Sequence, residues 1–229
     1  MTGTAQAGTG RWETLMARDG HEFACWLAKP EGTPRGAIVV LQEIFGVNSH
    51  IRSVADRFAA EGYLAIAPAL FDRVQQQVEL GYSPEDQQRG TGLRLQVPIE
   101  KALLDIGAAL RVVRHAGKVG VVGYCWGGML SWVCAAELDV NCAVGYYTSR
   151  VWEQIERAPR CPVLLHYGRS DAGIPLPEVE KLQARYPAAE VHLYDAGHGF
   201  ACDARASFDA ASAALAWERT LAFLRSQIG

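Results

Sequence analysis

The chain has 229 residues, of which 49% are hydrophobic and 21% charged, with a formal net charge of −3. This balance is typical of a globular protein and excludes disordered and fibrous classes. No long basic run points to nucleic acid or an anionic membrane as a partner, and no apolar run reaches the ~18 residues of a spanning helix. The N-terminus is polar rather than a secretory signal, so we expect a cytoplasmic protein in which residues 1–10 form a flexible tail.

The six cysteines form no C-x-x-C pair, and no Cys/His cluster has the spacing of a zinc site in the sequence. We therefore expect reduced thiols, most of them small buried hydrophobes, and neither a metal nor an organic cofactor. These cysteines are Cys25, Cys125, Cys134, Cys142, Cys161 and Cys202.

The apolar runs alternate with helical patterns along most of the chain. Residues 13–16 and 23–28 flank the turn dipeptide Asp19-Gly20 and predict an antiparallel hairpin. Further strands are predicted at 37–41, 63–67, 119–122, 143–147, 162–167 and 191–194, and helices at 48–60, 98–115, 126–137, 175–185 and 208–226. Residues 72–95 are polar and predict a long loop of the kind that forms lids. The pattern predicts one α/β domain over 1–229, with a mostly parallel sheet and helices on both faces.

A candidate nucleophile lies in GYCWGG, residues 123–128, between a Val-rich strand and a helix of small residues. This is the place of the G-x-S-x-G nucleophile elbow, with Cys125 for serine. The flanking glycines permit a sharp turn, and the helix start favours a thiolate. The amide of Trp126 would then point toward a developing oxyanion. A buried structural cysteine beside a tight turn is the alternative, which the placement between strand and helix disfavours.

The candidate acid and base follow in the chain order nucleophile, acid, base that is usual for this elbow. Asp171 lies in the loop after one later strand, and His198 in the loop after the next. A neutral His198 can accept the thiol proton, and Asp171 can orient its other ring nitrogen. Asp195 is a weaker alternative, since an aspartate three residues before a histidine more often stabilises a turn. The other histidines lie within strands or at turns and helix ends, where His50 is expected to be solvated.

Six segments, taken together and in order, resemble the dienelactone hydrolase family (carboxymethylenebutenolidases). They are QEIFGVN at 42–48, PALFDR at 68–73, GYCWGG at 123–128, GRSD at 168–171, GHGF at 197–200 and WERTLAFL at 217–224. The resemblance implies an α/β-hydrolase fold and a triad of Cys125, His198 and Asp171. The loop after the first parallel strand of such folds supplies the second oxyanion amide, which here is that of Ile44.

The resemblance also implies roles for residues around the triad. Glu43 would hold the proton of the resting thiol until substrate binds. Arg73 would match one of the arginines that bind the substrate's carboxylate, whereas Cys202 stands where the second arginine is expected and Arg205 is near but not aligned. Phe45 and Phe200 are candidates to shape the substrate pocket, although core packing is an equally good role for each.

The sequence thus predicts a cysteine hydrolase that opens dienelactone (4-carboxymethylenebut-2-en-4-olide) to maleylacetate through an acyl-enzyme, in the breakdown of aromatic compounds. The alternative is an esterase or thioesterase of the same fold acting on another small ester or lactone, which Cys202 favours. A non-catalytic binding protein would require a missing triad member, and none is missing. The expected partner is a small-molecule substrate, and the chain is expected to be a monomer or a small homo-oligomer.

Overall fold

The computed structural model describes residues 10–229 and contains one eight-stranded sheet in the order β1-β2-β4-β3-β5-β6-β7-β8. The hairpin strands β1 and β2 are antiparallel, and the strands from β4 to β8 along this order run parallel. The strands are β1 Arg11–Met16, β2 Glu22–Ala28, β3 Ala37–Leu41, β4 Leu64–Pro68, β5 Val119–Tyr124, β6 Cys142–Tyr146, β7 Val163–Gly168 and β8 Glu190–Tyr194.

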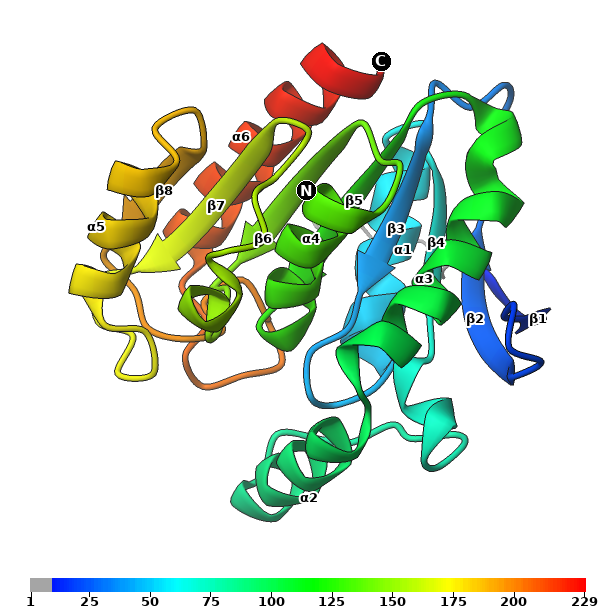
Figure 1. Ribbon diagram of the computed structural model, residues 1–229, viewed down its shortest axis with the longest axis horizontal. Coiled ribbons are helices and arrows are strands. Elements are labelled where there is room, and N and C mark those ends of the chain that lie inside the picture. The colour runs from blue at the N-terminus through cyan, green and yellow to red at the C-terminus, as the bar shows by residue number, and fades with distance from the viewer. Residues whose placement is uncertain (1–9) are drawn as a thin grey trace, which may run out of the picture.

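Helices cover both faces of this sheet. Helices α3 and α4 lie on one face and α1 and α6 on the other, with α5 at the β8 end (Figure 1). Strands β3 to β7 are buried along their whole lengths, which is why they are almost continuously apolar. The arrangement confirms the predicted fold class. The helices are α1 Ser49–Ala60, α2 Pro84–Gln96, α3 Ile99–Val113, α4 Trp126–Glu137, α5 Leu176–Arg185 and α6 Ala210–Ile228, with short 3-10 turns η1 Leu70–Arg73, η2 Arg114–Ala116 and η3 Val151–Gln154.

Helix α2 corrects the prediction of a loop over 72–95. Ser83 caps this helix through a reciprocal capping box with Asp86, and Pro84 occupies its first turn. The helix is polar on most sides and buries only Gly90 and Leu93, so no apolar stripe marks it in the sequence. It lies beyond the carboxyl ends of the central strands, apart from the other helices (Figure 1).

The tail predicted over 1–10 lies outside the described residues except for Gly10, which lies so close to the Trp26 indole that a Cβ there would be 2.2 Å from Nε1. Within residues 10–229, no helix has both the length and the apolar character needed to cross a bilayer.

Candidate functional site

Cys125 lies at the sharp turn between β5 and α4, where the backbone has a φ of 54° that non-glycine residues rarely adopt. The turn is possible because its glycines carry no side chain. A Cβ on Gly123 would lie 1.9 Å from the carbonyl oxygen of Gly127, and one on Gly127 would lie 2.4 Å from that of Leu41. The Cys125 amide donates to the carbonyl of Tyr146 at 3.0 Å, which fixes the turn against β6. This strained strand-to-helix turn is the geometry expected for a nucleophile elbow.

The structure places His198 beside Asp171 rather than beside Asp195. Nδ1 of His198 lies 2.7 Å from Oδ2 of Asp171, whose side chain is fully buried and whose Oδ1 accepts from the amide of Gly173 at 2.9 Å. Asp195, by contrast, has a side chain that is 94% exposed and pairs with Arg169. Of the two candidate carboxylates, only Asp171 can orient the imidazole.

The thiol of Cys125 lies close enough to His198 to alter its proton affinity. Burial by itself would lower the pKa of His198, but the charge of Cys125 and the hydrogen bond to Asp171 outweigh burial and raise this pKa to about 10. Sγ of Cys125 also lies 3.9 Å from Oγ of Ser149. The structure thus brings the sulfur, the imidazole and the carboxylate together from three distant segments.

Two backbone amides are free near the thiol. Trp126 is the first residue of α4, where helical amides have no internal acceptor, and neither its amide nor that of Ile44 has an acceptor within residues 10–229. The amide of Gly127 donates to the carbonyl of Gln42 at 3.1 Å, which ties the loop that carries Ile44 to the elbow. Both amides are therefore available as donors, and the role of Ile44 and Trp126 as an oxyanion hole stays a prediction.

Glu43 is buried beside the elbow, with a side chain that is 1% exposed. Its Oε1 lies 3.3 Å from Nη1 of Arg205, and its Oε2 has no hydrogen-bond partner in the described chain. Its charge adds to burial in raising the pKa values of Tyr82 and Tyr147, so both phenols lie near it. Among the hydrogen bonds of residues 10–229, Glu43 has none with Cys125, and its role as holder of the thiol proton stays a prediction.

Arg205 is a cation of this site that sequence reasoning set aside because it does not align with the family pattern. Its guanidinium lies 5.6 Å from the ring centre of Phe45 and 5.8 Å from that of Tyr82. It occupies space that Gly199 leaves open, since a Cβ there would lie 2.5 Å from Nη1. The residue before this glycine is His198, so Arg205 lies against the loop of the candidate base. Only the tertiary fold reveals this placement.

The two phenylalanines expected at the substrate pocket differ in their surroundings. Phe45 packs edge-on against Tyr82 at 4.6 Å, close to Arg205. Phe200 is fully buried between Tyr147 and Tyr194, and Tyr147 in turn lies 5.0 Å from the His198 ring. Phe200 therefore supports the histidine loop from within the core, whereas Phe45 remains a candidate to contact substrate.

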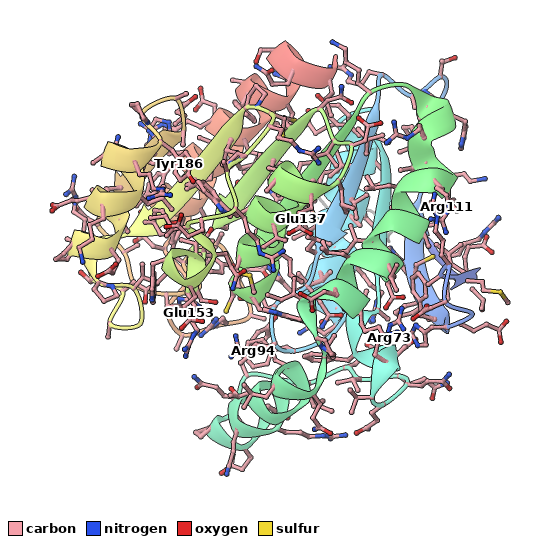
Figure 2. The ribbon with its side chains drawn as sticks, in the orientation of Figure 1. Arg73, Arg94, Arg111, Glu137, Glu153 and Tyr186 are labelled. Atoms are coloured by element: carbon pink, nitrogen blue, oxygen red, sulfur yellow. The ribbon has the colours of Figure 1, made fainter. Side chains whose placement is uncertain are left out.

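Arg73 lies in an ion-pair network rather than with the groups around Cys125. It donates to Asp105 at 2.9 and 2.6 Å and to Asp19 at 2.6 and 3.1 Å. The Asp105 side chain is fully buried, so Arg73 supplies the countercharge that this carboxylate needs. Figure 2 shows Arg73 on η1, near the side of the sheet where β1 and β2 lie. The geometry gives the substrate-binding role expected for Arg73 no support.

Comparison with known proteins gives a consistent result. The model of the family described as "Dienelactone hydrolase family" matches residues 23–228. A carboxymethylenebutenolidase of Pseudomonas putida is 37% identical over 224 residues, which cover 92% of this chain and 94% of that protein. A Klebsiella pneumoniae protein assigned as a dienelactone hydrolase superposes with a TM-score of 0.82 at 31% identity, covering 94% of this chain and 99% of that one. A dienelactone hydrolase-like promiscuous phosphotriesterase, at 20% identity and a TM-score of 0.75, shares the fold.

Proposed function

The chain belongs to the dienelactone hydrolase family and is a hydrolase acting on esters or lactones, and from this premise we propose that it opens dienelactone to maleylacetate through an acyl-enzyme on Cys125. The observation that carries the proposal is the meeting of Cys125, His198 and Asp171 at the elbow. A thiolate is the reactive form of cysteine, and the raised pKa of His198 makes this imidazole a strong acceptor for the thiol proton.

The reaction proceeds in two halves. The sulfur of Cys125 forms a bond to the lactone carbonyl carbon, the carbonyl electrons move to its oxygen, and the amides of Ile44 and Trp126 stabilise that oxyanion. The carbonyl re-forms as the ring C–O bond breaks, and the leaving enolate stays tethered in the same molecule. The enolate then either takes a proton from water directly or takes the imidazolium proton, which leaves neutral His198 free to deprotonate the water. The resulting hydroxide attacks the thioester, and its C–S bond breaks to release the product and the sulfur of Cys125.

Arg205 is our candidate for binding the carboxylate of the substrate in place of the missing second arginine. Its only anionic partner among residues 10–229 is Glu43, and its side chain is 18% exposed, so an incoming carboxylate can reach it. A guanidinium–carboxylate hydrogen bond contributes roughly 1.5–3 kcal/mol. In this proposal the substrate competes with Glu43 for Arg205, which couples substrate binding to the charge beside the elbow.

The role of Glu43 as a latch on the resting thiol can be tested by alkylation. If Glu43 holds the thiol proton until substrate arrives, iodoacetamide labels Cys125 faster when a carboxylate-bearing analogue that cannot acylate the thiol is bound. Labelling of Cys125 that is indifferent to ligand would remove the latch from the mechanism.

The acyl-enzyme itself is tested with Cys125→Ala and with Cys161→Ala as the matched control, since Cys161 is a partly exposed thiol outside the triad. We expect Cys125→Ala to lose both dienelactone hydrolysis and the substrate adduct that intact-mass spectrometry detects. Its thermal unfolding midpoint should equal that of the wild-type protein. Cys161→Ala should keep both activity and adduct. Turnover by folded Cys125→Ala, or an adduct on another cysteine, would refute the mechanism.

A second candidate function is hydrolysis of another small ester or thioester by the same residues. Cys202, at the position of the family's second arginine, favours it because the carboxylate clamp is altered there. Comparing kcat/KM for dienelactone with values for neutral aryl esters and thioesters decides between the two: a preference for the neutral substrates selects the second.

A further inference from the structure

A second group of metal-binding side chains lies outside the triad. His50 comes from the first turn of α1, and Cys202 and Asp203 come from the loop between His198 and α6. One possible ligand atom from each of the three lies within 4.8 Å of the others. His50 lies about 150 positions before Cys202 and Asp203 in the chain. Only the fold brings the histidine to the other two residues, and no sequence motif predicts the cluster.

The spacing of these atoms suits one metal ion. Zinc bonds are about 2.0–2.1 Å to a histidine nitrogen and about 2.3 Å to a thiolate, so tetrahedral ligands of one ion stand roughly 3.3–3.7 Å apart. Nδ1 of His50 already lies 3.3 Å from Oδ1 of Asp203. The remaining separations are at most 4.8 Å and would shorten by about 1 Å when an ion binds. The donor set of nitrogen, sulfur and oxygen is the set that zinc-like ions prefer.

His50 provides a second, independent observation. It was expected to be solvated, but its side chain is 5% exposed. Its Nε2 is buried and has no hydrogen-bond partner within residues 10–229. A buried ring nitrogen without a partner is costly, and such a group in a native protein calls for a ligand. Histidines that bind metals use one ring nitrogen for the ion and offer the other to a second partner. In His50 the ion would take Nδ1, the nitrogen that faces Asp203, and the buried Nε2 would be the nitrogen left for the second partner.

We propose that His50, Cys202 and Asp203 bind one divalent transition-metal ion of the zinc type, with its remaining coordination position open. Burial raises the pKa of the Cys202 thiol to about 11, so the ion must displace the thiol proton to solvent as the metal–sulfur bond forms.

An ion and a fourth ligand can both reach this site. The Asp203 side chain is 78% exposed and gives an incoming ion its first contact. His50 and Asp203 also line a cavity of about 230 Å³ bounded by Arg57, Tyr124 and Trp217, which has room for water or a small anion. Neither Cys125 nor His198 lines this cavity. Cys202 does not line it either and lies near Glu43, Tyr82 and Arg205, so the metal site adjoins the groups beside the elbow. A bound ion would tie α1 to the loop that carries His198 and Arg205.

Cobalt provides the probe, because tetrahedral cobalt–thiolate centres have a strong near-ultraviolet charge-transfer band. The chelator-treated full chain is titrated with Co²⁺ in the Cys125→Ala background, so that the elbow thiol cannot supply the band. We expect one Co²⁺ per chain, the charge-transfer band, and its loss when one equivalent of Zn²⁺ is added. Failure of Co²⁺ to bind, or a cobalt spectrum without the thiolate band, would overturn the proposal.

Matched variants assign the ligands. Cys202→Ser should abolish the band and His50→Gln should weaken Co²⁺ binding at least tenfold, whereas the controls Cys161→Ser and His115→Gln should change neither. Asp203→Asn alters an exposed side chain, so its effect does not depend on repacking a buried one, and we expect it to weaken binding as well. A band that survives Cys202→Ser in the folded protein, or unchanged affinity in Asp203→Asn, would overturn the assignment. None of these measurements depends on hydrolytic activity, so they stand apart from the test of the acyl-enzyme.

Discussion

Asp171 and His198 are joined by a 2.7 Å hydrogen bond between Oδ2 and Nδ1 that links the loops after β7 and β8. Because an ionised carboxylate only accepts, Nδ1 of the imidazole donates, which leaves Nε2 as the nitrogen that exchanges a proton. The bond therefore sets the direction in which the imidazole can act on the thiol.

Removing the charge of this carboxylate should slow the reaction. In Asp171→Asn the side chain keeps its shape but no longer favours the Nδ1–H tautomer, so we expect kcat to fall by about two to four orders of magnitude. Steady-state hydrolysis of dienelactone measures the loss. The control is Asp195→Asn, at the exposed alternative carboxylate, which should retain wild-type activity. Equal losses in the two variants would contradict the assignment of Asp171.

The proton affinity of His198 should depend on the sulfur. In the intact protein the pKa of His198 is raised to about 10, with Cys125 the largest contribution that raises it. The imidazolium should therefore persist below about pH 10, whereas in Cys125→Ala the pKa should fall and the ring should lose its proton at a lower pH. Histidine ring resonances followed by NMR across pH measure both values. An unchanged pKa in the variant would show that the sulfur does not interact with the ring.

Arg205 should discriminate substrates by charge. Arg205→Met removes the guanidinium but leaves Glu43 buried without its cation, so the informative variant is Glu43→Gln with Arg205→Met. Relative to Glu43→Gln alone, we expect the double variant to lower kcat/KM for dienelactone by roughly 10- to 100-fold, consistent with the loss of a charged hydrogen bond. The kcat/KM for a neutral aryl ester should change far less, and Arg169→Met serves as an exposed control. Equal losses on the charged and neutral substrates would exclude Arg205 as the carboxylate-binding residue.

Helix α2 should hold the Ile44 loop in place through Gly90. A Cβ at Gly90 would lie 1.9 Å from the carbonyl oxygen of Ile44, whereas one at Gly92 meets nothing within 4 Å. Gly90→Ala should displace the loop and lower kcat by up to about 10²-fold, since even a small misplacement of a catalytic group lowers the rate of the chemical step. Gly92→Ala should keep activity and stabilise the fold by roughly 0.5–1 kcal/mol. Similar kinetics in the two variants would show that α2 does not position this loop.

Arg73 should matter for stability rather than for substrate binding. Among residues 10–229, Arg73→Met leaves buried Asp105 with His21 as its one side-chain partner, and we expect the free energy of unfolding to fall by about 3 kcal/mol. Urea denaturation measures this loss, and KM for dienelactone should stay at its wild-type value. A raised KM with unchanged stability would instead support the substrate role that the family resemblance suggests.

The parts of the fold that sequence reasoning predicted best are those with strong local signals. The bounds of β3 and α4 match their predictions because an apolar run and a glycine-flanked turn define them. Helix α2 was not predicted because it has no apolar stripe in the sequence. Its local signal is the capping box formed by Ser83 and Asp86 at its N-terminus. A search for capping boxes would have found it.

The candidate site divides in a similar way. Cys125, Asp171 and His198 each follow a strand, and the topology of a parallel sheet collects such residues at one edge. Arg205 and His50 carry no such signal, because their roles depend on which side chains they meet across the molecule. The ion pairs of Arg73 likewise could not be predicted, since Asp19 and Asp105 approach it from separate segments.

The eight residues from His198 to Arg205 hold the candidate base, two of the candidate metal ligands and the guanidinium beside Glu43. A point substitution within this stretch can thus change which anions bind to the enzyme while His198 keeps its position relative to Asp171 and Cys125. An insertion or deletion there would shift all of these groups at once, so we expect engineered length changes in this segment to be far more damaging than changes of residue type.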